Sequence, residues 1–398
     1  MAKQKAIIDQ ALIDKLFPHW LEIRRDLHRH PELAFEEVET ARKIMAELDR
    51  LQIPYEYQGK GGGVIGRITG KASAHVPIIA LRADMDALPG TETSGLPFAS
   101  EFPGKMHACG HDAHVTMVLG AAALLQENPP PGQVLLVFQP AEESGGGARV
   151  IIKSGVLEGV RAIFGGHVTH HYRVGEIMVA EGVITAQSDS FTIHIHGRGG
   201  HGARPHEAID AVVIAGFLIT AVQTLVSRET DPLHPSVITI GQVEAGSAPN
   251  VIAESAVLRG SLRTTLPQVR RHLHRGLRRM VKALAELHGA EIDLQIREGY
   301  PPVINSPAET DIARRAAVEV VGEKGVMAME YPSMGSEDFA FYLQKLPGCY
   351  VRFGARKQEE EYIPLHSPAF DINEGVLKVG AAYFAAVAWE ALKRYEGG

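Results

Sequence analysis

The chain has 398 residues, of which 45% are hydrophobic and 22% are charged, proportions typical of a globular protein large enough for two or three domains. Its 40 basic and 47 acidic residues give a formal net charge of −7, which argues against nucleic acid or an anionic membrane as a partner. The two cysteines exclude a disulfide framework and indicate a cytoplasmic protein. No signal peptide is apparent, and the longest apolar run, residues 211–222, is too short to span a bilayer.

The first part of the chain alternates between helical and strand patterns. Apolar residues recur at helical spacing through the first ~50 residues, with breaks expected at Pro18, Pro31 and Pro54. Short apolar runs then predict strands at residues 64–68, 78–81, 134–138 and 162–164. Helices are expected between some of them, at residues 115–126 and 148–153. Short continuous apolar strands separated by helices predict a mainly parallel sheet with helices on both faces.

A different pattern begins near residue 186. It has the order β-α-β-β-α-β, which is ferredoxin-like, with strands expected at residues 191–196, 237–243, 256–262 and 291–296 and helices at 208–228 and 268–288. The α/β pattern resumes after Pro301, with a helix at 309–321, a strand at 349–353 and a helix at about 374–394. We therefore expect a discontinuous α/β domain, residues 1–185 and 299–398, and an inserted α+β domain, residues 186–298.

A dense group of metal-capable side chains follows the second predicted strand. Residues 106–114 read Met-His-Ala-Cys-Gly-His-Asp-Ala-His and contain three histidines, one cysteine and one aspartate. These are the side chains that bind zinc and similar metals. The central glycine would let Cys109 and His111 face one point. The alternative is a solvated loop that is rich in histidine.

Two adjacent carboxylates, Glu142 and Glu143, follow the next strand. They repel one another unless a cation or a proton separates them, so one could bind metal while the other acts as a general base. A solvated acidic turn before a helix is the alternative. His167 and His366 also follow predicted strands, and ligands of open α/β sheets bind beyond the carboxyl ends of the strands. A lone histidine is more often structural. His167 and His366 are favoured as ligands only because the segment at 106–114 and the paired glutamates are also present.

Two further segments carry polar candidates. Asp86 lies beyond the strand at 78–81, where it could hydrogen-bond a metal-ligating imidazole, or simply serve a turn. His201 and Arg204 lie in a glycine-rich segment of the inserted domain, whose glycines alone would be explained by a tight turn. No Gly-x-Ser-x-Gly motif is present, which argues against a serine hydrolase.

With these residues in place, the chain resembles the metal-dependent amidohydrolases that include aminoacylase, hippurate hydrolase and the indole-acetyl-amino-acid hydrolases. The resemblance runs from Leu-His-Arg-His-Pro-Glu-Leu at residues 27–33 to Leu-His-Ser-Pro at 365–368, and includes Gly-Ser-Glu-Asp-Phe at 335–339. It implies two divalent metal ions bound by Cys109, His111, Glu143, His167 and His366. It also implies that Glu142 is the general base, and the cysteine indicates the hippurate hydrolase-like branch.

The resemblance also bears on assembly. In this family the inserted domain often pairs two subunits, and the histidine that corresponds to His201 acts from the neighbouring subunit. It therefore implies a homodimer or a dimer of dimers. One departure is Thr-His-His at residues 169–171, where a proline is expected, and this difference leaves the identity of the substrate open.

The leading hypothesis is hydrolysis of the amide bond of an N-acyl amino acid or short peptide. Paired cations polarise the carbonyl and activate the attacking water, while Glu142 accepts its proton. A thiolate favours Zn²⁺, although the mixed ligands admit Mn²⁺ or Co²⁺. Asn250 and either Arg204 or Arg263 are candidates for binding the substrate carboxylate. The alternatives are a metallocarboxypeptidase or dipeptidase, an N-acetyl-diaminopimelate-type deacetylase, and a non-catalytic binding protein, against which the presence of Glu142 argues.

Overall fold

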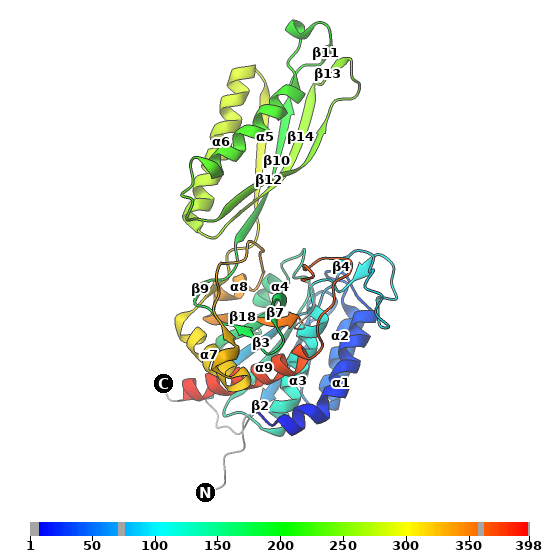
Figure 1. Cartoon of the computed structure of the whole chain (residues 1–398), viewed down its shortest axis with the longest axis vertical. Coiled ribbons are helices and arrows are strands. Elements are labelled where there is room, and N and C mark those ends of the chain that lie inside the picture. The colour runs from blue at the N-terminus through cyan, green and yellow to red at the C-terminus, as the bar shows by residue number, and fades with distance from the viewer. Residues whose placement is uncertain (1–7, 71–75, 357–361, 397–398) are drawn as a thin grey trace. The chain divides into compact units, whose positions relative to one another are not determined.

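The computed structural model describes residues 8–70, 76–356 and 362–396 of the chain. The chain divides into two compact units (Figure 1). Unit 1 comprises Met1–Ile184, Ile304–Tyr331 and Asp338–Gly398. Unit 2 comprises Thr185–Val303 and Pro332–Glu337. The insertion is expected from the sequence at residues 186–298.

Unit 1 is built on a mixed sheet, which has eight strands within the described residues, in the order β1-β2-β6-β3-β7-β18-β8-β17. Its four middle strands run parallel: β6 (Gln133–Gln139), β3 (Ile78–Asp84), β7 (Val160–Arg173) and β18 (Gly348–Arg356). On one side, β2 (Val64–Thr69) pairs antiparallel with β6 and with β1 (Tyr55–Tyr57). On the other side, β8 (Ile177–Met178) pairs antiparallel with β18 and parallel with β17 (Val326–Met327). The prediction of a mainly parallel mixed sheet is confirmed.

Helices cover this sheet, and the most buried is α3 (His111–Glu127), which contacts β3. It packs against α1 (Gln10–Arg29) and α9 (Val376–Glu396). The remaining α-helices among the described residues of unit 1 are α2 (Val38–Arg50), α4 (Gly147–Lys153), α7 (Pro307–Val321) and α8 (Ala340–Leu343). The apolar side chains of α3 continue without a polar face because neighbouring elements surround the helix.

Two local predictions were wrong. Pro18 lies inside α1 instead of ending a helix. A proline within a helix costs about 3 kcal/mol, but Ile13, Trp20 and Leu27, on both sides of it, are buried, and each such side chain contributes roughly 1.5–3 kcal/mol. The strand predicted at residues 162–164 also extends further, because β7 continues its pairing with β18 past His167.

Unit 2 has the expected β-α-β-β-α-β order. Its antiparallel sheet has the strand order β12-β14-β10-β15. These strands are β10 (Gln187–His196), β12 (Ser236–Ala245), β14 (Ser255–Thr264) and β15 (Glu291–Glu298). Helices α5 (Ala211–Ser227) and α6 (Pro267–His288) pack against each other and against the sheet (Figure 1). The ferredoxin-like arrangement is therefore confirmed. Among the described helices, none is both long and apolar enough to cross a membrane.

Candidate metal centre

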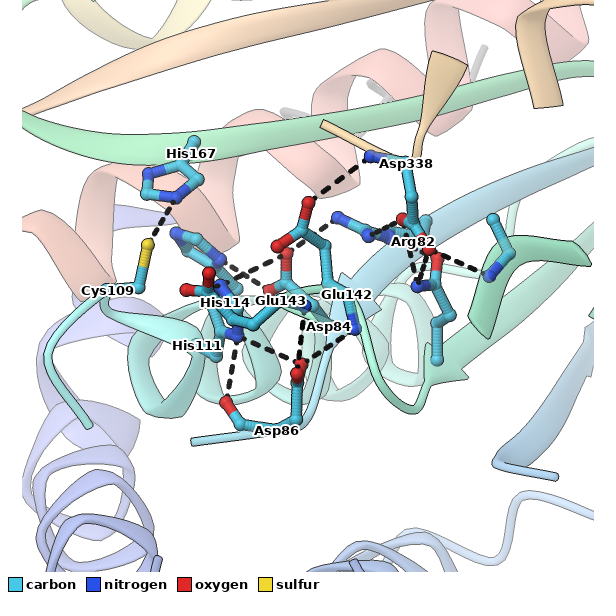
Figure 2. Close-up of polar contacts among 12 residues, drawn as sticks. Arg82, Asp84, Asp86, Cys109, His111, His114, Glu142, Glu143, His167 and Asp338 are labelled. Carbon is cyan, nitrogen blue, oxygen red and sulfur yellow. Dashed lines mark hydrogen bonds and ion pairs between the residues drawn. The ribbon is translucent and has the colours of Figure 1, made fainter. Parts of the chain in front are cut away.

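The polar candidates of unit 1 come from neighbouring parallel strands and from the loops that leave them. Asp86 follows β3, Glu142 and Glu143 follow β6, and His167 lies within β7. Because β6, β3 and β7 are adjacent and parallel, their carboxyl ends lie at one edge of the sheet. Figure 2 shows these side chains directed towards a common region.

The loop that carries Cys109 and His111 depends on the glycine between them. Gly110 has a φ of +93° and is the N-cap of α3. A Cβ atom at this position would lie 2.3 Å from Cγ2 of Val168. Both the left-handed backbone and the close approach of Val168 therefore require glycine. This turn brings Cys109 and His111 to the same side of the loop.

All five predicted ligands are brought together. Sγ of Cys109 lies 3.2 Å from Nε2 of His167. Oε1 of Glu143 lies 3.8 Å from Nε2 of His111 and 3.3 Å from Nε2 of His366. Their potential ligand atoms form overlapping groups of three within 4.8 Å of one another, namely Cys109/His111/His167, Cys109/Glu143/His366 and His111/Glu142/Glu143. His366 has a φ of +67°, a conformation that non-glycine residues rarely adopt.

The hydrogen bonds of two imidazoles fit a metal centre. Nδ1 of His111 lies 2.8 Å from the backbone carbonyl of Asp86, and Nδ1 of His167 lies 2.6 Å from that of Val168. A carbonyl oxygen accepts only from a protonated nitrogen, so Nδ1 is the donor in both rings and Nε2 is left for another partner. Nε2 of His111 is buried and forms no hydrogen bond within the described residues. Buried polar nitrogens are rarely left this way, and a cation would satisfy it.

The surrounding charges also favour a cation. Burial and the nearby Glu143 carboxylate raise the pKa of Cys109 well above the ordinary value of a thiol. Burial by itself would lower the pKa of His111, but the charge of Asp84 and the hydrogen bond to Asp86 raise it well above its usual range. The contributions of Glu143 and Asp84 to these shifts reflect anionic surroundings. A divalent cation would reverse the shift at Cys109, since coordinated thiols lose their proton.

One histidine of the metal-capable segment has a different task. His114 places Nδ1 2.6 Å from the Asp84 carboxylate, and its Nε2 accepts the Val168 amide at 3.0 Å. Neither nitrogen is left for a metal, so His114 links β3 to β7 instead. The Asp84 carboxylate also binds the Arg82 guanidinium at 2.7 Å. Asp84 was not among the predicted site residues, although its position at the end of a buried strand, two residues before Asp86, was a usable signal.

The Glu142 segment is fixed by hydrogen bonds to its backbone. The Asp86 carboxylate accepts the amides of Glu142 and Glu143, each at 3.0 Å, and one of its oxygens lies 3.2 Å from Nδ1 of His111 (Figure 2). Oε1 of Glu142 accepts the backbone amide of Asp338 at 3.2 Å. Glu142 is only 6% exposed. A carboxylate that is buried beside potential metal ligands is suited to transfer a proton there. Asp338 was part of a family-like motif but was not predicted at the site.

The remaining candidates belong to unit 2. His201 pairs with Val251 through the short strands β11 (Gly200–His201) and β13 (Val251–Ile252). His201 and Asn250 line one cavity of about 670 Å³, whose walls are rich in glycine. Arg204 is not among the residues that line this cavity, and its guanidinium lies 3.8 Å from Glu207 at the exposed surface. Arg263 does not line the cavity either, and its guanidinium donates to the Met334 carbonyl at 2.9 Å. Of the four predicted residues, unit 2 therefore groups His201 with Asn250.

Comparison with known proteins agrees with this arrangement. The family described as "Peptidase family M20/M25/M40" matches residues 80–390, which include all five candidate ligands and Glu142. The chain belongs to this family. As an M20 protein it is a metal-dependent hydrolase of the amidohydrolase and peptidase type, which confirms the predicted enzyme class.

Curated M20 relatives match the chain over almost its whole length. "IAA-amino acid hydrolase ILR1-like 4" of Arabidopsis thaliana is 41% identical, covering 92% of this chain and 84% of the relative. "N-acetylcysteine deacetylase" of Bacillus subtilis is also 41% identical and covers 95% and 98%. "Thermostable carboxypeptidase 2" of Saccharolobus solfataricus is 38% identical and covers 92% and 94%.

A solved structure shares both the fold and the family. The Bacillus subtilis YXEP protein, described as a dinuclear metal binding peptidase from the M20 family, is 37% identical with a TM-score of 0.82. The match covers 96% of this chain and 99% of that one.

Proposed function

We propose that this M20 enzyme hydrolyses the amide bond of N-acyl amino acids and uses two divalent ions, with Zn²⁺ the first candidate and Mn²⁺ or Co²⁺ the alternatives. The ions would be held by Cys109, His111, Glu143, His167 and His366. The observation that carries the proposal is the convergence of these five side chains beside a further buried carboxylate, Glu142. When bound, such ions polarise the scissile carbonyl and lower the pKa of water.

Each remaining step falls to a side chain of the protein. Glu142 accepts a proton from the attacking water and later delivers it to the amine that leaves. His201 donates a hydrogen bond to the oxyanion that develops on the carbonyl. Asn250, which shares a cavity with His201, binds the substrate carboxylate through its amide. Arg204 is a weaker candidate for that contact, because it does not line this cavity.

The choice of substrate class is supported by two relatives. Their names, IAA-amino acid hydrolase and N-acetylcysteine deacetylase, describe enzymes of N-acylated amino acids with different acyl groups. The carboxypeptidase relative supports the second candidate, a metallocarboxypeptidase or dipeptidase. An N-acetyl-diaminopimelate-type deacetylase is a more specific version of the first candidate, the N-acyl amino acid hydrolase. The small number of cysteines keeps the cytoplasm as the proposed location.

We also propose a homodimer, or a dimer of dimers, formed through unit 2. Helix α5 exposes about half of the side chains of Val212, Val213 and Phe217 to solvent. Strand β12 lies at the edge of its sheet and exposes Val237 and Val243. Exposed apolar side chains beside an open strand edge favour pairing with a second copy. Sedimentation of the purified protein, and of a Phe217→Glu variant, tests this proposal.

A hydrolysis panel tests the function. Metal-free protein should be inactive, and Zn²⁺, Mn²⁺ or Co²⁺ should restore turnover of N-acetyl amino acids, hippurate and indole-acetyl amino acids. Faster turnover of unblocked dipeptides would favour the peptidase alternative. Glu142→Gln should abolish turnover and keep both ions, whereas Glu143→Gln should lose metal. Chelator-resistant turnover, or protein without bound metal, would refute the metal-dependent mechanism.

A further inference from the structure

A buried carboxylate outside the ligand set lies against the loop that carries Glu142. Glu37 is 3% exposed, and its Oε1 accepts the backbone amide of Ala141 at 2.7 Å. Burial raises the pKa of Glu37 to about 7, so the surroundings disfavour its charged form. Burying a carboxyl group costs free energy of folding. The presence of Glu37 at this position therefore suggests that its contact has a role.

Helix capping does not explain Glu37. It occupies the N-cap position of α2, yet its side chain forms no capping hydrogen bond. The amides of Glu39 and Thr40 are instead bound by the carboxylate of Glu32, at 3.1 and 2.8 Å. The hydrogen bond that Glu37 makes is directed away from its own helix, to a residue 104 positions later in the chain.

The residue that Glu37 holds has an unfavourable backbone conformation. Ala141 is fully buried and has a φ of +52°, in the left-handed region. For a residue with a side chain this costs roughly 1–2 kcal/mol, so surrounding contacts must maintain it. Ala141 directly precedes Glu142, and a change in its backbone would redirect the Glu142 carboxylate.

Other contacts of this segment have separate tasks. Asp86 binds the amides of Glu142 and Glu143 and also contacts His111, so a substitution there would disturb the candidate ligands as well. Phe35 also has a positive φ, +65°, and its ring packs so closely on Gly145 that a Cβ there would lie 2.2 Å from Cε2. The segment from Phe35 to Glu37 thus contacts both ends of the Glu142 loop.

We propose that Glu37 is a positioning residue for the general base: by accepting the Ala141 amide it holds the left-handed turn that orients Glu142. This inference rests on the proposed role of Glu142. It concerns the orientation of that carboxylate and leaves metal binding to other residues.

The test separates the hydrogen bond from the charge. Glu37→Gln keeps an acceptor oxygen and should retain kcat. Glu37→Leu removes the acceptor and should lower kcat by roughly 10–100-fold, since small misplacements of a catalytic group have effects of this size. KM and the content of two ions per chain should not change. If Glu37→Leu does not fold, Glu37→Ala provides the same loss with a smaller side chain.

A second substitution makes the test specific. Glycine adopts positive φ without steric cost, so Ala141→Gly should restore most of the kcat lost in Glu37→Leu. Glu47→Leu is the matched control, because Glu47 is a buried carboxylate of the same helix that is bound to His19 and Arg50 instead. It should lower stability and leave kcat unchanged.

The outcomes are distinguishable. Unchanged kcat in Glu37→Leu, or no recovery with Ala141→Gly, would overturn the positioning role. If Glu142→Gln retains turnover in the same assay, the proposed role of Glu142 itself fails. If Glu142→Gln is inactive while the Glu37 variants behave like wild type, only the inference about Glu37 is overturned.

Discussion

Replacing Gly110 by alanine tests the local geometry of the metal-ligand loop. Gly110 and Gly175 have nearly identical φ values, +93° and +92°. A Cβ at Gly110 would lie 2.3 Å from Cγ2 of Val168, whereas a Cβ at Gly175 would have no neighbour within 4 Å among the described residues. Gly175→Ala is therefore a control with the same backbone cost and no steric overlap.

The two costs can be estimated separately. The left-handed backbone conformation destabilises a folded protein with alanine by about 1–2 kcal/mol. Alanine also reduces the conformational entropy of the unfolded chain, which stabilises the folded state by about 0.4–1 kcal/mol. Gly175→Ala should thus lower the free energy of unfolding by about 1 kcal/mol. Gly110→Ala adds steric overlap, which costs about 1–3 kcal/mol in a packed interior, for a total of roughly 2–4 kcal/mol. Movement of Val168 would also displace the adjacent His167, so metal affinity should fall only in Gly110→Ala.

Urea unfolding followed by tryptophan fluorescence measures this difference. Trp20 and Trp389, the two tryptophans of the chain, both belong to unit 1, so the signal reports the unit that contains Gly110. Val168→Ala should recover part of the loss in the Gly110→Ala background by removing the overlapping methyl group. Equal destabilisation by Gly110→Ala and Gly175→Ala, with metal affinity unchanged in both, would refute the packing argument.

Three further predictions concern single groups. The folded-state pKa of Glu37, about 7, lies above its ordinary value of 4.5, so its contribution to stability is present below pH 4.5 and is lost as the pH rises through 7. The loss amounts to about 3 kcal/mol. Glu37→Gln should therefore make the free energy of unfolding depend less on pH between pH 5 and 8, and an unaltered slope would contradict the assignment. Cys109 is 7% exposed, and metal bound to its sulfur should slow its reaction with thiol reagents; equal rates with and without metal would count against ligation. Cys349 is fully buried, and burial raises its pKa to about 12, so it should stay unreactive in both forms. Mixing Glu142→Gln chains with His201→Ala chains should restore about one quarter of wild-type activity, if subunits exchange freely in a two-fold dimer and His201 acts on the neighbouring subunit. No recovery would mean that His201 acts within its own subunit or only supports its loop.

The sequence by itself determined the types of element and most of their positions. Short apolar strands alternating with helices predicted the parallel centre of the sheet, and the β-α-β-β-α-β order predicted unit 2. Such patterns are local, because burial of one face leaves a period of two or 3.6 residues. The metal-capable residues at 106–114 and the adjacent Glu142 and Glu143 could also be found, because they are close together in the sequence. Pro18 was misjudged because packing outweighed a local propensity.

Only the tertiary structure distinguished the three histidines of residues 106–114. His111 directs a free Nε2 towards Glu143, His114 uses both nitrogens to join β3 to β7, and the buried His107 forms no hydrogen bond within the described residues. Spacing along the chain could not separate them, since each role depends on which strands are neighbours. The contact between Glu37 and Ala141 spans 104 positions and leaves no periodic trace in the sequence. Contacts of this kind are fixed by strand order and by the path of each loop, and these emerge only when the whole chain packs.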